Sequence, residues 1–155
     1  PVVTFGSEVT FHWNGETMRA VHVPASHTDG DVIIHYQNVD AIHMGDTFFN
    51  GRYPFIDTES GGTVQGMIGS ANTVLGMAKP STKIIPGHGD VASRVELTAF
   101  RDMLVTVSDR IQPMVARGMS ADAVVAAKPT ADLDPKWGNT PERFVRAVYQ
   151  GLGGR

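Results

Sequence analysis

The sequence has 155 residues, no cysteine, and a formal net charge of −3 that comes from 13 Lys and Arg against 16 Asp and Glu. A chain of this length can bury the core of one domain, the absence of cysteine excludes disulfides and thiolate chemistry, and the mild negative charge disfavours a nucleic-acid partner. No stretch approaches the roughly 20 apolar residues that a membrane span requires and no targeting segment is visible, so we expect one soluble unit over residues 1–155 with no membrane partner, and its compartment stays open.

A β-hairpin is predicted near the start of the chain. Asn14 and Gly15 form a strong short-range hairpin signal and separate two apolar segments. Pairing Trp13 with Glu16 fixes the register and gathers apolar side chains on one face. These side chains are Val9, Phe11, Trp13, Met18, Ala20 and His22. We expect this face to meet the core.

Three more apolar segments predict strands at 32–36, 39–44 and 83–85. The first two are apolar on both faces, which is typical of strands buried between layers. Strands therefore dominate the first part of the chain and helices the second. This order predicts layers of sheet and helix stacked on each other.

Helices are predicted over most of the second part. A segment of small residues at 60–78 is followed by a capping box at 93–96, which opens a long amphipathic helix that Pro113 kinks or splits. Ser120 caps a short helix, and Thr140 with the following proline begins a last one.

Potential metal ligands stand beside glycine in three short segments, at 26–31, 43–46 and 86–90. Imidazole and carboxylate are donors that zinc accepts, and they also suit iron or manganese. Each segment alone is more readily a capped turn or a hydrogen-bonded loop. Their joint occurrence at strand ends, where active sites of layered folds gather, predicts a metal site.

In this order the motifs resemble those of the metallo-β-lactamase fold superfamily. The resemblance is carried by HTDGD at 27–31, GDTFFNGRYPFID at 45–57 and IPGHGD at 85–90. It implies an αββα sandwich with a dinuclear metal site, usually of zinc, at one edge. It also implies hydrolysis as the reaction.

The resemblance assigns a ligand set by position. It implies that His27 ligates the first metal, Asp46 bridges both, and His88 ligates the second. The family's first motif, His-x-His-x-Asp-His, is absent. Each ion would then have about two protein ligands, whereas catalytic zinc has at least three plus water. We therefore expect weak metal binding and no catalytic residue that acts in this chain alone.

The missing motif also predicts the fold class. We expect an α/β unit of layers that is the C-terminal half of an αββα sandwich, with a mixed β-sheet and helices on one face. Such a half exposes the sheet face that its other half covers, and exposed apolar patches bind partners. Self-association, or pairing with the missing N-terminal half, follows as an expectation.

Six further residues are candidates for bracing the ligands or lining a pocket. They are Thr28, Asp31, His43, Asn50, Arg52 and Tyr53. Other interpretations stay open for some of them: turn capping for Thr28 and Asp31, a core position for His43, and a structural salt bridge for Arg52.

Two functions are consistent with these patterns. The first is a metal-dependent hydrolase, with two zinc ions in the intact site, that acts on a small ester, thioester or lactam and is inactive as a fragment. The alternative is a non-catalytic fragment or subunit that assembles with a partner chain or with a copy of itself.

Overall fold

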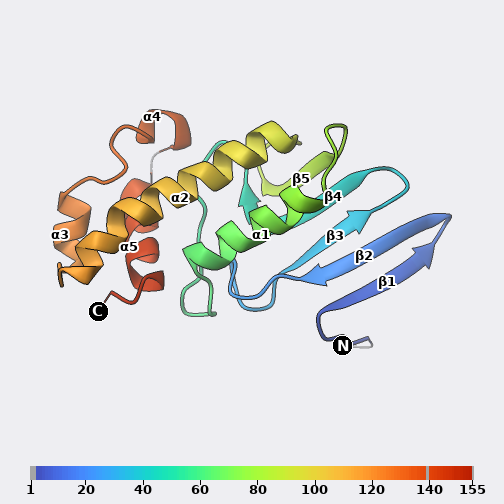
Figure 1. Cartoon of the computed structure of the whole chain (residues 1–155), viewed down its shortest axis with the longest axis horizontal. Coiled ribbons are helices and arrows are strands. Elements are labelled where there is room, and N and C mark those ends of the chain that lie inside the picture. The colour runs from blue at the N-terminus through green and yellow to red at the C-terminus, as the bar shows by residue number, and fades with distance from the viewer. Residues whose placement is uncertain (1–2, 139, 155) are drawn as a thin grey trace.

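Five strands form one mixed sheet in the computed structural model, which describes residues 3–138 and 140–154 (Figure 1). The strands are β1 (Glu8–Trp13), β2 (Glu16–His22), β3 (Val32–Tyr36), β4 (Ala41–Phe49) and β5 (Lys83–His88). They follow chain order across the sheet, and all neighbours are antiparallel except β4 and β5, which are parallel. The predicted mixed sheet is confirmed.

One face of this sheet forms the core with two helices. Helices α1 (Val64–Met77) and α2 (Arg94–Ala116) lie across it (Figure 1). Side chains alternate between the faces of a strand, and Ile33, Ile42 and Ile84 on this face are fully buried. The fully buried side chains of the two helices are Val64, Met67, Ala71, Val74, Leu97, Phe100, Leu104, Val107 and Ile111. Helices on one face are thus confirmed, and this apolar contact is the main source of stability.

The predicted hairpin forms with its predicted register, but its apolar face is not in the core. Trp13 pairs with Glu16, and Asn14 and Gly15 both have positive φ, as a type I′ turn requires. Phe11 is 42% exposed and Trp13 is 70% exposed, so their predicted burial is wrong. The strand register explains the exposure of Phe11 and Trp13, because it places both side chains on the sheet face that points away from α1 and α2.

That outer face continues across the rest of the sheet. Ile34 on β3 lies opposite Ala20 on one side and His43 on the other. His43 in turn lies opposite Ile85 of β5. Within the described part of the chain, Ile34, His43 and Ile85 are only partly covered. The sheet therefore has one buried face and one apolar face that is half exposed.

The remaining helices form a tail beyond the C-terminal ends of β4 and β5 (Figure 1). They are α3 (Ala121–Ala126), α4 (Asp134–Trp137) and α5 (Pro141–Gly151). The Ser93 capping box of α2 is confirmed. The expected split at Pro113 is wrong, because α2 continues through this residue to Ala116; a proline in the last turn removes little of the hydrogen-bond ladder. The alternative, a kink at Pro113, stays a prediction. Across residues 3–138 and 140–154, no helix combines the length and hydrophobicity of a membrane span.

Candidate functional site

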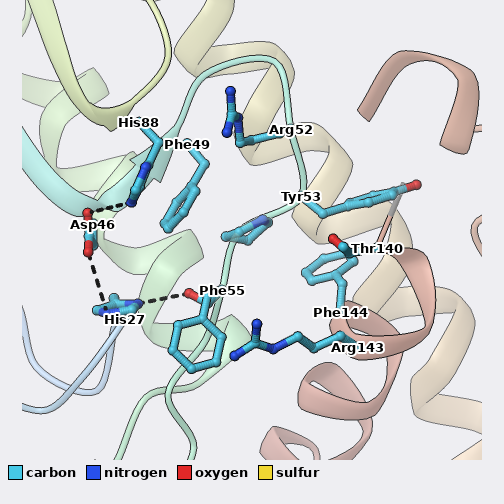
Figure 2. A pocket seen from close by; sticks show the side chains of 11 residues that line it. His27, Asp46, Phe49, Arg52, Tyr53, Phe55, His88, Thr140, Arg143 and Phe144 are labelled. Carbon is cyan, nitrogen blue, oxygen red and sulfur yellow. Dashed lines mark hydrogen bonds and ion pairs between the residues drawn. The ribbon is translucent and has the colours of Figure 1, made fainter. Parts of the chain in front are cut away.

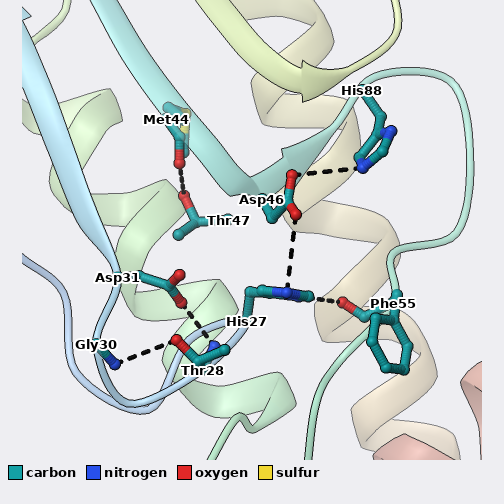
Figure 3. Close-up of polar contacts among 9 residues, drawn as sticks. All are labelled: His27, Thr28, Gly30, Asp31, Met44, Asp46, Thr47, Phe55 and His88. Carbon is teal, nitrogen blue, oxygen red and sulfur yellow. Dashed lines mark hydrogen bonds and ion pairs between the residues drawn. The ribbon is translucent and has the colours of Figure 1, made fainter. Parts of the chain in front are cut away.

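His27, Asp46 and His88 meet at one edge of the sheet (Figure 3). Asp46 follows Gly45, whose φ of 55° interrupts the regular pairing of β4 with β5. His88 ends β5, and His27 lies in the loop after β2. Nε2 of His88 is 3.4 Å from Oδ1 of Asp46, and Nε2 of His27 is 3.8 Å from Oδ2. The carboxylate therefore turns one oxygen toward each imidazole.

Hydrogen bonds fix both the loop and the ring of His27. The backbone N–H and the hydroxyl of Thr63, which caps α1, both donate to the carbonyl of Ala25 at 2.9 Å. Nδ1 of His27 donates to the carbonyl of Phe55 at 2.8 Å. A carbonyl only accepts, so the proton of a neutral ring is on Nδ1. The lone pair on Nε2 then faces Asp46.

His88 and Asp46 are held by close packing. The ring of His88 stacks on Phe49, with centroids 4.5 Å apart and an interplanar angle of 19°. Gly87 lies directly against the carboxylate: a Cβ at this position would be 2.2 Å from Oδ1 of Asp46. A residue with a side chain at 87 would displace the carboxylate, which explains the glycine before His88.

Thr28 and Asp31 shape the turn that follows His27. The N–H of Thr28 donates to Oδ2 of Asp31 at 2.7 Å, and the N–H of Gly30 donates to the hydroxyl of Thr28 at 3.1 Å. Among the described residues, neither side chain hydrogen-bonds to the His27 ring. Their contacts are those of turn capping (Figure 3).

Two of the other candidates lie away from the pocket. Nδ2 of Asn50 donates to the carbonyl of Asp90 at 3.0 Å, which ties the segment after β4 to the loop after β5. His43 lies on the outer face of the sheet, opposite Ile34 and Ile85. In the part of the chain that the structure covers, it makes no hydrogen bond to Asp46.

A cavity of about 480 Å³ opens beside the three candidate ligands (Figure 2). Small-molecule sites measure about 300–1,000 Å³. Phe49 and residues 52–55 form one wall, which includes Arg52. Thr140, Arg143 and Phe144 of the helical tail form another. The sequence analysis missed these tail residues, because no local spacing links them to the motifs at the strand ends.

Tyr53 attaches the tail to the pocket. Its hydroxyl donates to Oδ1 of Asp134 at 2.8 Å, and its ring stacks on Phe144 with centroids 4.8 Å apart. Burial raises the pKa of the Tyr53 phenol, and the contact with Asp134 raises it further. Tyr53 therefore lines the cavity as a neutral anchor.

The sequence matches no protein-family model and no curated protein significantly, whereas the fold matches solved structures. The stereoselective inverting sec-alkylsulfatase Pisa1 from Pseudomonas sp. gives a TM-score of 0.72 at 16% identity, over 97% of this chain and 26% of that chain. A β-lactamase domain protein from Burkholderia ambifaria gives 0.63 at 17% identity, over 96% and 43%. A metallo-β-lactamase from Pontibacter korlensis gives 0.59 at 16% identity, over 68% and 49%.

These likenesses show the fold. The chain has part of the metallo-β-lactamase fold, as its motifs predicted, and it spans between 26% and 49% of the length of the three structures. At 16–17% sequence identity, the likeness shows that the architecture is shared and does not show that the activity is.

The donor chemistry fits one side of the two-metal centre that this fold implies. When the His27 ring is neutral, its Nε2 lone pair and an oxygen of Asp46 are two acceptors 3.8 Å apart, and a cation would satisfy both. The hydrogen bond from Nδ1 of His27 to a carbonyl is the orientation that metal-binding histidines adopt. However, residues 3–138 and 140–154 contain no cluster of three His, Asp or Glu that could hold an ion. An ion at this position would need further protein donors.

Proposed function

We propose that this chain supplies one side of a two-metal hydrolytic centre. His27 and His88 would each give an Nε2 donor to this centre, and Asp46 would give its carboxylate. The observation that carries the proposal is the position of Asp46, whose two oxygens face different imidazoles. Zinc accepts this donor set, and iron and manganese are alternatives.

The proposed reaction is the hydrolysis of a small ester, thioester or lactam. The metals, when bound, activate water and stabilise the negative charge that develops on the substrate. The chain's own contribution is to hold the donors: the Phe55 carbonyl orients His27, and Phe49 packs on His88. Structural neighbours whose names denote hydrolases, an alkylsulfatase and metallo-β-lactamases, support this reaction class.

The isolated chain is expected to bind metal weakly and to lack useful hydrolytic activity. Each ion would receive about two donors from the described residues, and catalytic zinc needs at least three plus water. A complete site would need its remaining donors from outside the described residues or from a partner chain.

Calorimetric titration of the isolated chain with Zn²⁺ tests the donor assignment. We expect weak binding that Asp46→Asn abolishes, because the neutral amide loses the charge shared by both ions. His12→Gln is the matched control, since it removes an exposed imidazole on β1. Affinity that is unchanged in Asp46→Asn would contradict the donor set. Tight binding of two ions by the unmodified chain would contradict the incomplete site.

Assembly with a partner chain or a second copy is a second candidate function. It is supported by the outer sheet face, where Phe11 and Trp13 are 42% and 70% exposed. Apolar patches of this kind mark protein interfaces. An unmodified chain that assembles and binds no Zn²⁺ would favour this function over the hydrolytic one.

A further inference from the structure

Two cationic side chains in the pocket lack a carboxylate partner. Arg52 and Arg143 both line the cavity, and within the described part of the chain neither forms an ion pair or a hydrogen bond. Four other arginines of the described residues form ion pairs, among them Arg110 with Asp132 and Arg146 with Asp122. Unpaired guanidinium groups beside a cavity leave their planar set of donors available to a ligand.

The carboxylate that lines the pocket does not neutralise Arg52 and Arg143. Among the described residues that line the cavity, Asp46 is the one carboxylate. Its oxygens face His27 and His88, on the side of the cavity away from the tail (Figure 2). The candidate metal donors therefore lie on one side of the pocket, Arg143 lies on the side of the tail, and Arg52 lies on the wall formed by the segment after β4 (Figure 2).

Arg143 is held in place by its surroundings. It lies in the first turn of α5, and its Cζ is 4.0 Å from the centroid of the Phe55 ring. Phe144, the next residue of α5, stacks on Tyr53 and so fixes this helix against the pocket wall. A guanidinium held over an aromatic ring loses less freedom when a ligand binds.

The surfaces next to these cations are apolar. Phe49, Phe55 and Phe144 line the same cavity, so a ligand has aromatic surface within reach of the guanidinium groups (Figure 2). Guanidinium groups bind carboxylate and related oxyanions through two parallel hydrogen bonds. This combination selects a molecule with an anionic end and an apolar body.

We propose that Arg143 binds the oxyanion group of a small substrate whose apolar part lies against the phenylalanines. This rests on the proposed function, since it names the substrate class of the same pocket: a small organic anion that carries the ester, thioester or lactam. Arg143 acts in binding and specificity and does not take part in the chemical step.

Titration of the metal-free chain with phenylacetate and with uncharged phenylacetamide tests this proposal, with binding followed by NMR chemical shifts. Phenylacetate should bind about tenfold more tightly, the value of one charge-assisted hydrogen-bond pair. Arg143→Gln should remove this preference, and Arg143→Lys should keep part of it, because lysine retains the charge without the planar fork. Arg52→Gln should lower the preference without abolishing it.

Arg117→Gln is the matched control, because it removes the same charge from an exposed residue outside the cavity. Equal binding of the two probes, or a preference that Arg117→Gln reduces as much as Arg143→Gln, would overturn the proposal. Metal is absent from this experiment, so its outcome is independent of the Zn²⁺ titration. If the unmodified chain binds Zn²⁺ but shows no preference for phenylacetate, the anion site alone is refuted. If it prefers phenylacetate but does not bind Zn²⁺, the metal centre alone is refuted.

Discussion

The backbone and the side chain of Phe55 contact two different functional groups. Its carbonyl accepts the hydrogen bond from Nδ1 of His27 at 2.8 Å, and its ring lies 4.0 Å from the guanidinium carbon of Arg143. The first contact orients a candidate metal ligand, and the second holds the candidate anion-binding residue. Only the second depends on an aromatic side chain.

Phe55→Leu should therefore separate the two roles. Leucine keeps the carbonyl and much of the apolar contact with the His27 ring, so Zn²⁺ affinity should stay within about twofold of the original. The aromatic face is lost, and phenylacetate affinity should fall about two- to fivefold, the value of an exposed cation–π contact. Calorimetry of both ligands measures the two effects. A variant that loses Zn²⁺ affinity and keeps phenylacetate affinity would show the opposite division of roles.

Two glycines of α1 provide a test of how the His27 loop is held. A Cβ at Gly66 would lie 1.8 Å from the carbonyl oxygen of Ala25, whereas nothing lies within 4 Å of a Cβ at Gly69. Gly66→Ala should lower the free energy of unfolding by about 1–3 kcal/mol, because α1 must move away from the loop. Gly69→Ala should raise it by up to about 1 kcal/mol, since alanine favours helix.

Urea unfolding of Gly66→Ala and Gly69→Ala measures both changes in the free energy of unfolding. Because Gly66 packs against the loop that carries His27, its variant should also bind Zn²⁺ more weakly, and Gly69→Ala should not. A Gly66→Ala protein as stable as Gly69→Ala would refute the close approach of helix and loop.

Local signals in the sequence predicted local structure well. The Asn14–Gly15 turn and the Ser93 capping box form as expected, because each depends on residues next to it in the chain. The predicted ligands His27, Asp46 and His88 also lie together, since they belong to short motifs at strand ends. Their role as metal ligands stays a prediction.

Contacts between distant segments could not be derived in the same way. Alternation along β1 predicts an apolar face, but it does not say whether that face or the opposite one meets the helices. The strand at 32–36 is apolar on both faces, so its sequence does not indicate which face of the sheet meets the helices. The burial of Trp13 was therefore predicted wrongly. The position of Arg143 depends on how Tyr53 packs against α5, and no spacing in the sequence encodes that contact.

The outer sheet face should cause the chain to self-associate. Trp13 is 70% exposed and is the most exposed aromatic side chain of that face. Trp13→Thr keeps a residue with good strand propensity and should shift the association to higher protein concentration, as seen by sedimentation velocity. Val95→Thr is the matched control, because Val95 is 73% exposed on α2, away from this face. A chain that is monomeric at all concentrations, or equal effects of the two substitutions, would count against association through β1.

His35 should make the protein less stable as the pH falls below neutrality. Burial within the sheet lowers the pKa of this imidazole, which outweighs the opposing effect of Asp40. The unfolded chain therefore takes up the proton first, near its ordinary pKa of about 6.5, and stability is lost from there down to the lowered pKa of the folded state. His35→Gln cannot be protonated, so its free energy of unfolding should fall less between about pH 7 and pH 5. Urea unfolding at the two pH values measures the difference, and His12→Gln, at an exposed position on β1, should keep the original dependence. Equal losses in the His35→Gln and original proteins would exclude His35 as the source.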